Sequence, residues 1–269
     1  MSIGELILET PTKLPPEQFP TPILEIVVGS TLHGTAVQDG LEDLDMMAIV
    51  VERPRQFIGF SSVDTWVHRT KPEGVRSEAG DLDLAVYGLK KYLHLALKGN
   101  PTILLALFAP EAFIRRHDVR GRQLQALAPY IVSKQCYGPF RGYMTQQHER
   151  LLGLRGQRNI TRPELVEKYG YDTKYAAHIV RLGLQGEEIL STGRMTLPMP
   201  EEQRQLCLNV RTGGYTLAAV SQLIMDVEKR IEAAKEASKL PDNPDRKTVE
   251  KWMLRTYLTA WASHELDAL

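Results

Sequence analysis

Residues 27–51, VVGSTLHGTAVQDGLEDLDMMAIVV, contain the pattern on which the predicted fold depends. An apolar strand ends at Gly29-Ser30, a polar loop follows, and an Asp-Leu-Asp sequence opens a second apolar strand. Because successive side chains of a strand point to opposite faces, Asp43 and Asp45 are expected to project side by side. The short connection favours antiparallel pairing of these two strands over a helical crossover.

The acids of this segment have no basic residue close to them in the sequence. Residues 14–52 contain seven Asp or Glu residues and no Lys or Arg. Adjacent like charges repel one another unless water or a cation compensates them. Carboxylate oxygens are the hard ligands that Mg²⁺ prefers. We therefore predict a divalent metal site at Asp43 and Asp45, with Mg²⁺ as the first candidate.

The Gly-Ser turn before these acids is suited to binding phosphate. A short helix after the strand at residues 23–28 would present backbone N–H groups and the positive end of its dipole to an anion. Gly29 allows close approach to the backbone, and Ser30 adds a hydroxyl donor. A helix-capping role for Ser30 is compatible with this interpretation, because a helix start beside paired carboxylates is also how a phosphate site is built.

A third acid occurs on a later predicted strand. Residues 81–87, DLDLAVY, alternate so that Asp81 and Asp83 share one face while two leucines and a valine share the other. Two further short strands are predicted at residues 56–60 and 65–69. After residue 88 the apolar period is almost entirely helical, so the pattern changes from mixed α/β to helical near residue 128.

A basic stripe is predicted on the helix that begins near residue 172. At about 100° per residue, Lys174, His178 and Arg181 lie within about 60° of one another. Such a stripe is suited to a triphosphate or to a nucleic-acid backbone. The alternative is a solvated helix face on which Glu188 pairs with the cations.

Four motifs together resemble a known superfamily. GSTLHG, EDLD and DLAVYGLKKYLHLALKGNPT, with the less specific KYAAHIVRLGLQGEEILSTG, are similar to motifs of the DNA polymerase beta-like nucleotidyltransferases, most of all the RNA-repair-pathway branch. The resemblance spans residues 23–195 and implies an α+β fold, with a small mixed or antiparallel sheet and flanking helices before an all-helical C-terminal domain. We expect a nucleotidyltransferase catalytic domain at residues 1–128. A helical domain at residues 129–269 is expected to close the nucleotide and acceptor cleft.

The resemblance also implies which residues form the active site. The acids of the Asp-x-Asp motif and a third strand acid bind two metal ions in the family, here Asp43, Asp45 and Asp83, with Mn²⁺ as the alternative to Mg²⁺. The family pattern favours Asp83 over Asp81, because its acid directly precedes the strand that leads into the helix with the GNPT signature. The expected nucleotide- and phosphate-binding residues are Gly29, Ser30, Lys174, His178 and Arg181.

The implied activity is that of an enzyme. Members of the superfamily transfer a nucleoside monophosphate from a nucleoside triphosphate, such as ATP, to an acceptor hydroxyl and release pyrophosphate. RNA is the acceptor that the branch implies, and a protein or a small molecule is the alternative. A catalytically inactive, nucleotide-binding regulator is a further alternative, because a fold does not guarantee its chemistry.

Composition limits the remaining classes of protein. The 269 residues include 33 basic and 33 acidic side chains, which argues against a strongly basic nucleic-acid coat protein. Cys136 and Cys207 show no metal-binding spacing and are expected to be buried thiols. The N-terminus lacks a signal-peptide pattern, and no apolar run reaches the roughly 20 residues of a membrane span. We expect a cytoplasmic protein without a membrane partner, and the oligomeric state stays open.

Overall fold

The computed structural model describes residues 19–37, 44–60, 62, 64–71, 81–152 and 162–263. The chain divides into two compact units. The first comprises Met1–Leu97, Ile103–Ile131 and Asp245–Leu269, and the second comprises Lys98–Thr102 and Val132–Pro244. The chain therefore leaves the first unit after residue 131 and returns to it at residue 245.

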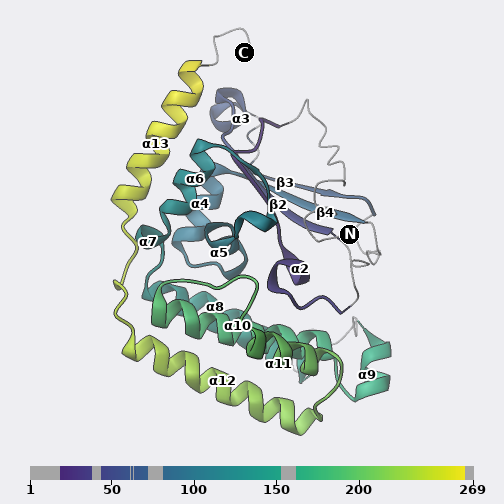
Figure 1. The fold of residues 1–269 in the computed structure, drawn as a ribbon. Coiled ribbons are helices and arrows are strands. Elements are labelled where there is room, and N and C mark those ends of the chain that lie inside the picture. The colour runs from purple at the N-terminus through teal and green to yellow at the C-terminus, as the bar shows by residue number, and fades with distance from the viewer. Residues whose placement is uncertain are drawn as a thin grey trace. The chain divides into compact units, whose positions relative to one another are not determined.

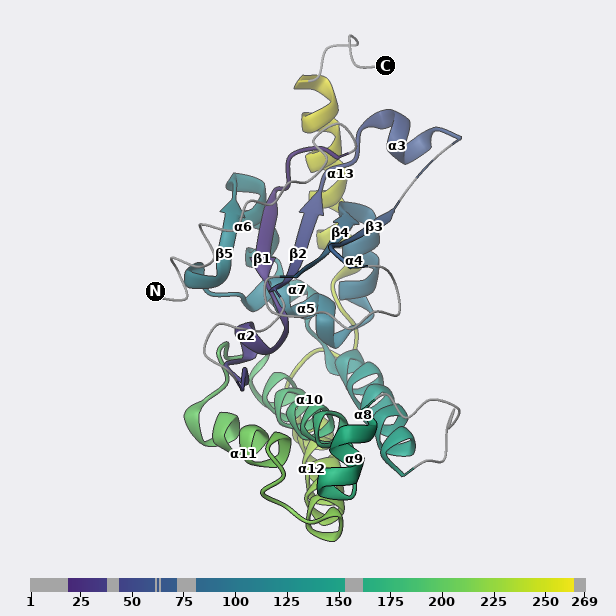
Figure 2. The same cartoon turned by 90° about the vertical axis from the view of Figure 1, so that its right-hand side faces the viewer.

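The first unit is built on a mixed five-stranded sheet with the strand order β3-β4-β2-β1-β5. Its strands are β1 (Leu24–Val27), β2 (Leu44–Val50), β3 (Thr65–Arg69), β4 (Leu82–Gly88) and β5 (Ile114–His117). Strands β1 and β2 pair antiparallel, which confirms the prediction from their short connection, whereas β2 and β4 pair parallel. Figure 2 shows the five strands side by side.

Helices of the first unit lie along one side of this sheet (Figures 1 and 2). They are α4 (Leu89–Leu97), α5 (Pro101–Phe108), α6 (Val119–Ala126) and α7 (Ala128–Ile131). Two shorter helices, α2 (Gly29–His33) and α3 (Pro54–Ile58), follow β1 and β2. Helix α4 buries one apolar stripe, as its helical period predicts.

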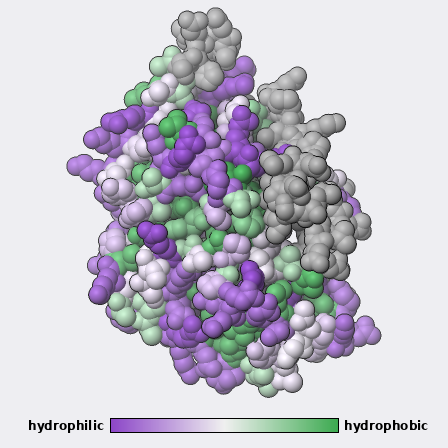
Figure 3. Space-filling view, in the orientation of Figure 1, coloured by the Kyte–Doolittle hydropathy of each residue, from purple (hydrophilic) through white to green (hydrophobic). Residues whose placement is uncertain are grey.

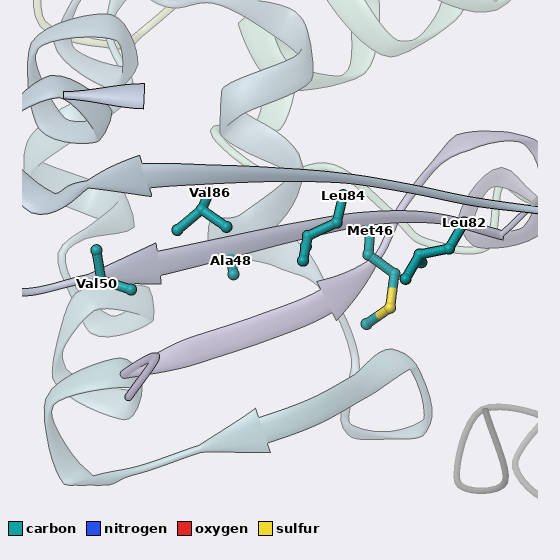
Figure 4. Close-up of a cluster of buried hydrophobic side chains, with 6 residues drawn as sticks. All are labelled: Met46, Ala48, Val50, Leu82, Leu84 and Val86. Atoms are coloured by element: carbon teal, nitrogen blue, oxygen red, sulfur yellow. The ribbon is translucent and has the colours of Figure 1, made fainter. Parts of the chain in front are cut away.

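A cluster of buried apolar side chains fixes the register of β2 against β4. Figure 4 shows its members along the two adjacent strands: Met46, Ala48 and Val50 of β2 beside Leu82, Leu84 and Val86 of β4. Met46 lies opposite Leu84, and Ala48 lies opposite Val86. A shift by one residue would move every one of these side chains to the other face of the sheet. The same alternation places the acids of both strands on the face opposite this cluster.

The segment predicted as a strand at residues 56–60 is a helix instead. Helix α3 begins at Pro54, which directly follows Arg53 in an extended conformation. The fixed φ of proline suits the first turn of a helix, and this local signal outweighs the short apolar run after it. The strand predicted at residues 65–69 is confirmed as β3.

The last helix, α13 (Arg246–Ser263), belongs to the first unit. The ring of Phe57 lies 4.9 Å from that of Tyr257 and 5.5 Å from that of Trp261. The indole N–H of Trp261 also donates to the backbone carbonyl of Glu52 at 2.8 Å. These contacts join α13 to the sheet-containing unit, and the expected domain boundaries, 1–128 and 129–269, stay a prediction.

A buried polar network fastens α13 to the start of α4. One carboxylate oxygen of Glu52 accepts from the Leu89 backbone N–H at 2.9 Å and from the Tyr257 hydroxyl at 2.5 Å. The Tyr257 oxygen in turn accepts from the Lys90 backbone N–H at 3.0 Å. Burial raises the pKa of the Glu52 carboxyl above its usual value, against the opposing effect of these hydrogen bonds. The network joins segments about 200 residues apart in the sequence.

The second unit consists of helices, as predicted for the C-terminal part of the chain. They are α8 (Tyr137–Leu151), α9 (Pro163–Tyr169), α10 (Thr173–Thr192), α11 (Glu201–Arg211) and α12 (Leu217–Ala237). Helix α10 packs against α8, α11 and α12. A Cβ added at Gly183 would lie 2.0 Å from Val227, and one at Gly186 would lie 2.3 Å from Ile231, so these glycines allow α12 to approach closely.

The surface and the two cysteines agree with the composition. Hydrophilic residues cover much of the face seen in Figure 3. Both Cys136 and Cys207 are buried free thiols, as predicted. Among the described residues, no helix combines the length and the hydropathy that crossing a membrane requires.

Candidate active site

Two of the predicted metal-binding acids are neighbours in the sheet. Asp45 of β2 lies directly opposite Asp83 of β4 in the parallel register. Opposite residues of such a pair share a face of the sheet, and neighbouring strands lie about 4.8 Å apart. Both side chains are partly exposed, with 28% of the Asp83 side chain accessible. The two carboxylates therefore project together from the end of the sheet where β2 and β4 begin.

Gly29 packs directly against the first of these acids. Its φ is +67°, and a Cβ built on it would lie 2.1 Å from an Asp45 carboxylate oxygen. The backbone N–H of Val28 donates to the Asp45 carbonyl at 2.9 Å, which holds the end of β1 against β2. Only glycine combines this left-handed conformation with this close approach. The Gly-Ser turn, with Ser30 in α2, thus begins beside Asp45.

The structure distinguishes Asp81 from Asp83. Asp81 accepts a hydrogen bond from the Thr70 hydroxyl at 2.8 Å and lies 3.2 Å from the Lys71 ammonium. Asp83 lies 3.8 Å from the Arg69 guanidinium, whose side chain is 46% exposed, so water screens that pair. The carboxylate of Asp81 is therefore engaged by neighbouring side chains, whereas Asp83 occupies the position opposite the β2 acid.

Asp43, the other acid of the predicted Asp-x-Asp pair, lies outside the described residues. The described part of the chain contains no group of three His, Cys, Asp or Glu side chains able to hold a metal ion. Asp45 and Asp83 nevertheless supply two hard oxygen ligands on one face, which is the ligand type that Mg²⁺ and Mn²⁺ prefer. The donor set that the structure describes therefore fits a divalent ion.

The predicted basic stripe lies on α10 of the second unit. Lys174 is exposed, and His178 and Arg181 are partly buried. The helix begins after Asp172, whose carboxylate accepts from the backbone N–H groups of Lys174 and Tyr175 at 3.0 and 3.1 Å. This cap fixes the helix start and hence the direction of the stripe.

Burial and the neighbouring positive charges both lower the pKa of the histidine in this stripe. Burial lowers the pKa of His178 to about 3, assisted by the positive charges of Arg181, Lys174 and Arg162. Burial also lowers the pKa of Arg181 to about 10, so the guanidinium still carries its charge at neutral pH. His178 is therefore a neutral imidazole among three cations.

Arg162 is a member of this group that the sequence pattern did not reveal. Its guanidinium donates to the Asp172 carboxylate at 3.0 Å and lies 5.2 Å from the centre of the Tyr175 ring. It precedes α9, so it falls outside the helical period of α10. Its one sequence signal, an Arg before Pro163, is common at ordinary helix starts. We call Arg162, Lys174, His178 and Arg181 the α10 basic cluster.

The Glu188 carboxylate, which the alternative interpretation pairs with the cations of a solvated helix face, contacts a residue beyond the end of α10. The Glu188 carboxylate accepts a hydrogen bond from the Thr196 backbone N–H at 3.0 Å. Arg181 instead donates to the side-chain oxygen of Gln185 at 2.9 Å. Two helical turns, about 10 Å, separate Arg181 from Glu188 along the axis. The carboxylate of Asp172 contacts this cluster, because it pairs with Arg162 and also caps the helix.

Comparisons with known proteins identify the family. Among solved structures, a nucleotidyltransferase-like protein from Exiguobacterium sibiricum is similar at 13% identity, with a TM-score of 0.29 over 92% of this chain and 76% of that one. The comparison with curated proteins finds no match. Residues 17–255 match the model of the RNA repair pathway DNA polymerase beta family, which confirms the resemblance inferred from the motifs. Because this match includes most of the sheet-containing unit and all of the helical one, the chain belongs to the RNA repair pathway DNA polymerase beta family.

Proposed function

We propose that this protein transfers a nucleoside monophosphate from a nucleoside triphosphate, such as ATP, to a hydroxyl group of an RNA acceptor and releases pyrophosphate. The observation that carries the proposal is the placement of Asp45 opposite Asp83, with Gly29 packed against Asp45. This arrangement combines oxygen ligands with a turn that an anion can approach closely. Family membership supports the general class, a polymerase beta-type nucleotidyltransferase in RNA repair.

Three carboxylates would hold the divalent ions in this proposal. Asp43, Asp45 and Asp83 would bind two Mg²⁺ ions, or Mn²⁺, which lower the pKa of the attacking hydroxyl and neutralise charge on the triphosphate. Strands β2 and β4 supply the oxygens of Asp45 and Asp83, and the hydrogen bonds between these strands set the spacing of the two carboxylates. A fixed spacing favours accurate positioning of the reacting groups.

The remaining predicted residues would bind the nucleotide. Gly29 and Ser30 are proposed to contact the phosphates beside the acids, through backbone N–H groups and a hydroxyl. Lys174, His178 and Arg181 are proposed to add charge and a neutral hydrogen-bonding imidazole from the helical domain. The helical domain would close the nucleotide and acceptor cleft.

The bond changes in this reaction are simple. The acceptor oxygen bonds to the α-phosphorus as the bond from that phosphorus to the bridging oxygen of pyrophosphate breaks. The hydroxyl proton leaves to water. In-line transfer of this kind depends mainly on positioning and on stabilising negative charge, which are the roles assigned to the acids and cations above.

A labelling experiment tests the proposal and its alternatives. The purified chain is incubated with Mg²⁺ and each α-labelled nucleoside triphosphate, with RNA, protein and small-molecule pools as acceptors. Label on RNA supports the proposal, and label on a protein or small molecule selects the alternative acceptors. No label in any pool would favour the nucleotide-binding regulator. Asp45→Asn should abolish labelling in a folded variant, and undiminished labelling by that variant would contradict the assigned site.

A further inference from the structure

Two large apolar side chains extend into solvent just beyond the end of β2. Ile58 is 74% exposed, and Phe60, at 113%, is as open as a side chain in an extended peptide. Ile58 is the last residue of α3, and Phe60 follows it after Gly59. Large apolar side chains gathered on a surface commonly mark a binding site.

Their exposure does not come from a loosely attached segment. Phe57, within the same helix, contacts the rings of Tyr257 and Trp261. Figures 1 and 2 show α3 beside the C-terminal half of α13. The helix is therefore held against the first unit by one aromatic side chain, while Ile58 and Phe60 remain outside.

The described residues near these side chains include exposed cations. Arg55 and Lys90 are both exposed, and the Lys90 ammonium lies 4.6 Å from the centre of the Phe57 ring. Two acids lie close by in the sequence or the fold, but Glu52 is buried and Asp64 pairs with Lys91 at 3.1 Å. We call Arg55, Phe57, Ile58, Phe60 and Lys90 the α3 surface.

An exposed aromatic ring in the same short segment as an exposed cation, here Phe60 and Arg55, has the chemistry of a contact for single-stranded nucleic acid. Bases stack on such rings without regard to sequence, and the cations attract the phosphates. A membrane surface fits less well, because α3 has only five residues and cannot present the long apolar face of an interfacial helix.

We propose that the α3 surface binds the single-stranded part of the acceptor RNA, several nucleotides away from the end that reacts. This inference rests on the proposed function. Strand β2 runs from Asp45 toward Glu52, and seven residues at about 3.3 Å each give a separation of about 23 Å. At about 3.4 Å per stacked nucleotide, the RNA must extend about seven nucleotides from its reactive end to reach the position of Glu52, after which α3 and Phe60 follow in the chain.

The test measures binding of fluorescently labelled, unstructured RNA to the full chain without nucleotide. Phe60→Ala should weaken binding of a 20-nucleotide RNA about tenfold, which is the range of one lost base stack, and should not change binding of a 5-nucleotide RNA. Arg55→Ala should reduce the slope of log affinity against log salt by about 0.7, because one phosphate contact is lost. Met225→Ala, which truncates another exposed apolar side chain, is the matched control and should change neither quantity.

Several results would overturn the proposal. One is that Phe60→Ala binds the long RNA with the affinity of the wild type, and another is that it loses the same factor of affinity for both RNA lengths. The proposal also fails if the wild-type chain does not bind RNA, or if Phe60 is needed for binding to anionic vesicles and not to RNA. Because Phe60 is fully exposed, thermal unfolding of the variant should match that of the wild type. If RNA binding depends on Phe60 but no labelled nucleotide is ever transferred, the α3 surface stands and the proposed enzymatic function fails. If label is transferred to RNA while Phe60→Ala binds RNA as the wild type does, the proposed enzymatic function stands and the role of the α3 surface fails.

Discussion

Asp45 and Asp83 are direct neighbours across a parallel strand pair whose register is unbroken. Their strands lie about 4.8 Å apart, which is suitable for two carboxylates that share one ion or hold two adjacent ions. Asp81 lies two residues earlier in the chain, yet its carboxylate is held by Thr70 and Lys71. Similar acids close in sequence therefore occupy different electrostatic environments.

This difference predicts the outcome of two matched substitutions. Asp83→Asn should reduce nucleotidyl transfer at least about 100-fold, as expected when a group that stabilises transition-state charge is lost. Asp81→Asn removes the same charge from the same segment and should retain activity within about threefold. Initial rates of label transfer at saturating Mg²⁺ compare the two variants. A larger loss in Asp81→Asn would assign the third acid to Asp81.

The close approach of Gly29 to Asp45 predicts that two Gly→Ala variants differ in stability and activity. Gly29→Ala should lower stability by about 1–3 kcal/mol and impair transfer, because a Cβ would be strained at φ +67° and would strike the Asp45 carboxylate. Gly142→Ala in α8 is the control, since a Cβ added there would meet nothing within 4 Å and alanine favours helices. Urea unfolding and label transfer measure both effects. Unchanged stability and activity of Gly29→Ala would contradict the close approach.

The catalytic half of the candidate site could be predicted from sequence because its signals are local. A strand ending in Gly29-Ser30 and the period-two alternation around Asp83 need only neighbouring residues to be recognised, and the register then brings the acids together. The pairing of β2 with β4 was not predicted, because the apolar alternation of each strand determines its buried face but not its partner.

The parts that sequence could not predict depend on distant contacts. Tyr257 meets Glu52 across 205 positions, so no period within α13 could reveal that it returns to the first unit. Arg162 joins the α10 basic cluster through Asp172, ten residues away and outside the helix. Helix α3 was mistaken for a strand because its five residues are too few to show a helical period.

Two Tyr→Phe variants, one inside the Glu52 network and one outside it, should differ in their effect on stability. Tyr257→Phe should destabilise the protein by about 1–3 kcal/mol, because Glu52 loses a donor and the Lys90 N–H loses its acceptor. Tyr92 is completely buried, and its hydroxyl has no hydrogen-bond partner within the described structure. Tyr92→Phe should therefore be neutral or stabilising. Equilibrium urea unfolding compares the two, and equal losses would count against the network.

The raised pKa of Glu52 predicts a specific pH dependence of stability. A carboxyl whose folded pKa lies above its unfolded value contributes stability that is present at low pH and is lost as pH rises through the folded pKa. The free energy of unfolding of the wild type, relative to Glu52→Gln, should therefore fall as pH rises from about 4.5. Urea unfolding of both proteins between pH 4 and 7 measures this difference. A constant difference would show that the pKa is not raised.

The α10 basic cluster predicts how the titration of His178 responds to its neighbours. Burial is the main cause of the low pKa of the imidazole, and Arg162→Ala removes the smallest of the three positive charges that assist it, so the pKa should rise only slightly above about 3. Arg204→Ala removes a guanidinium from α11 that pairs with Glu201, and it should leave His178 unchanged. Proton NMR titration of the imidazole gives both values. If the cluster binds triphosphate, Arg162→Ala should also raise the KM for the nucleotide more than it lowers kcat, whereas a purely structural role at the start of α10 would leave the KM of the folded variant unchanged.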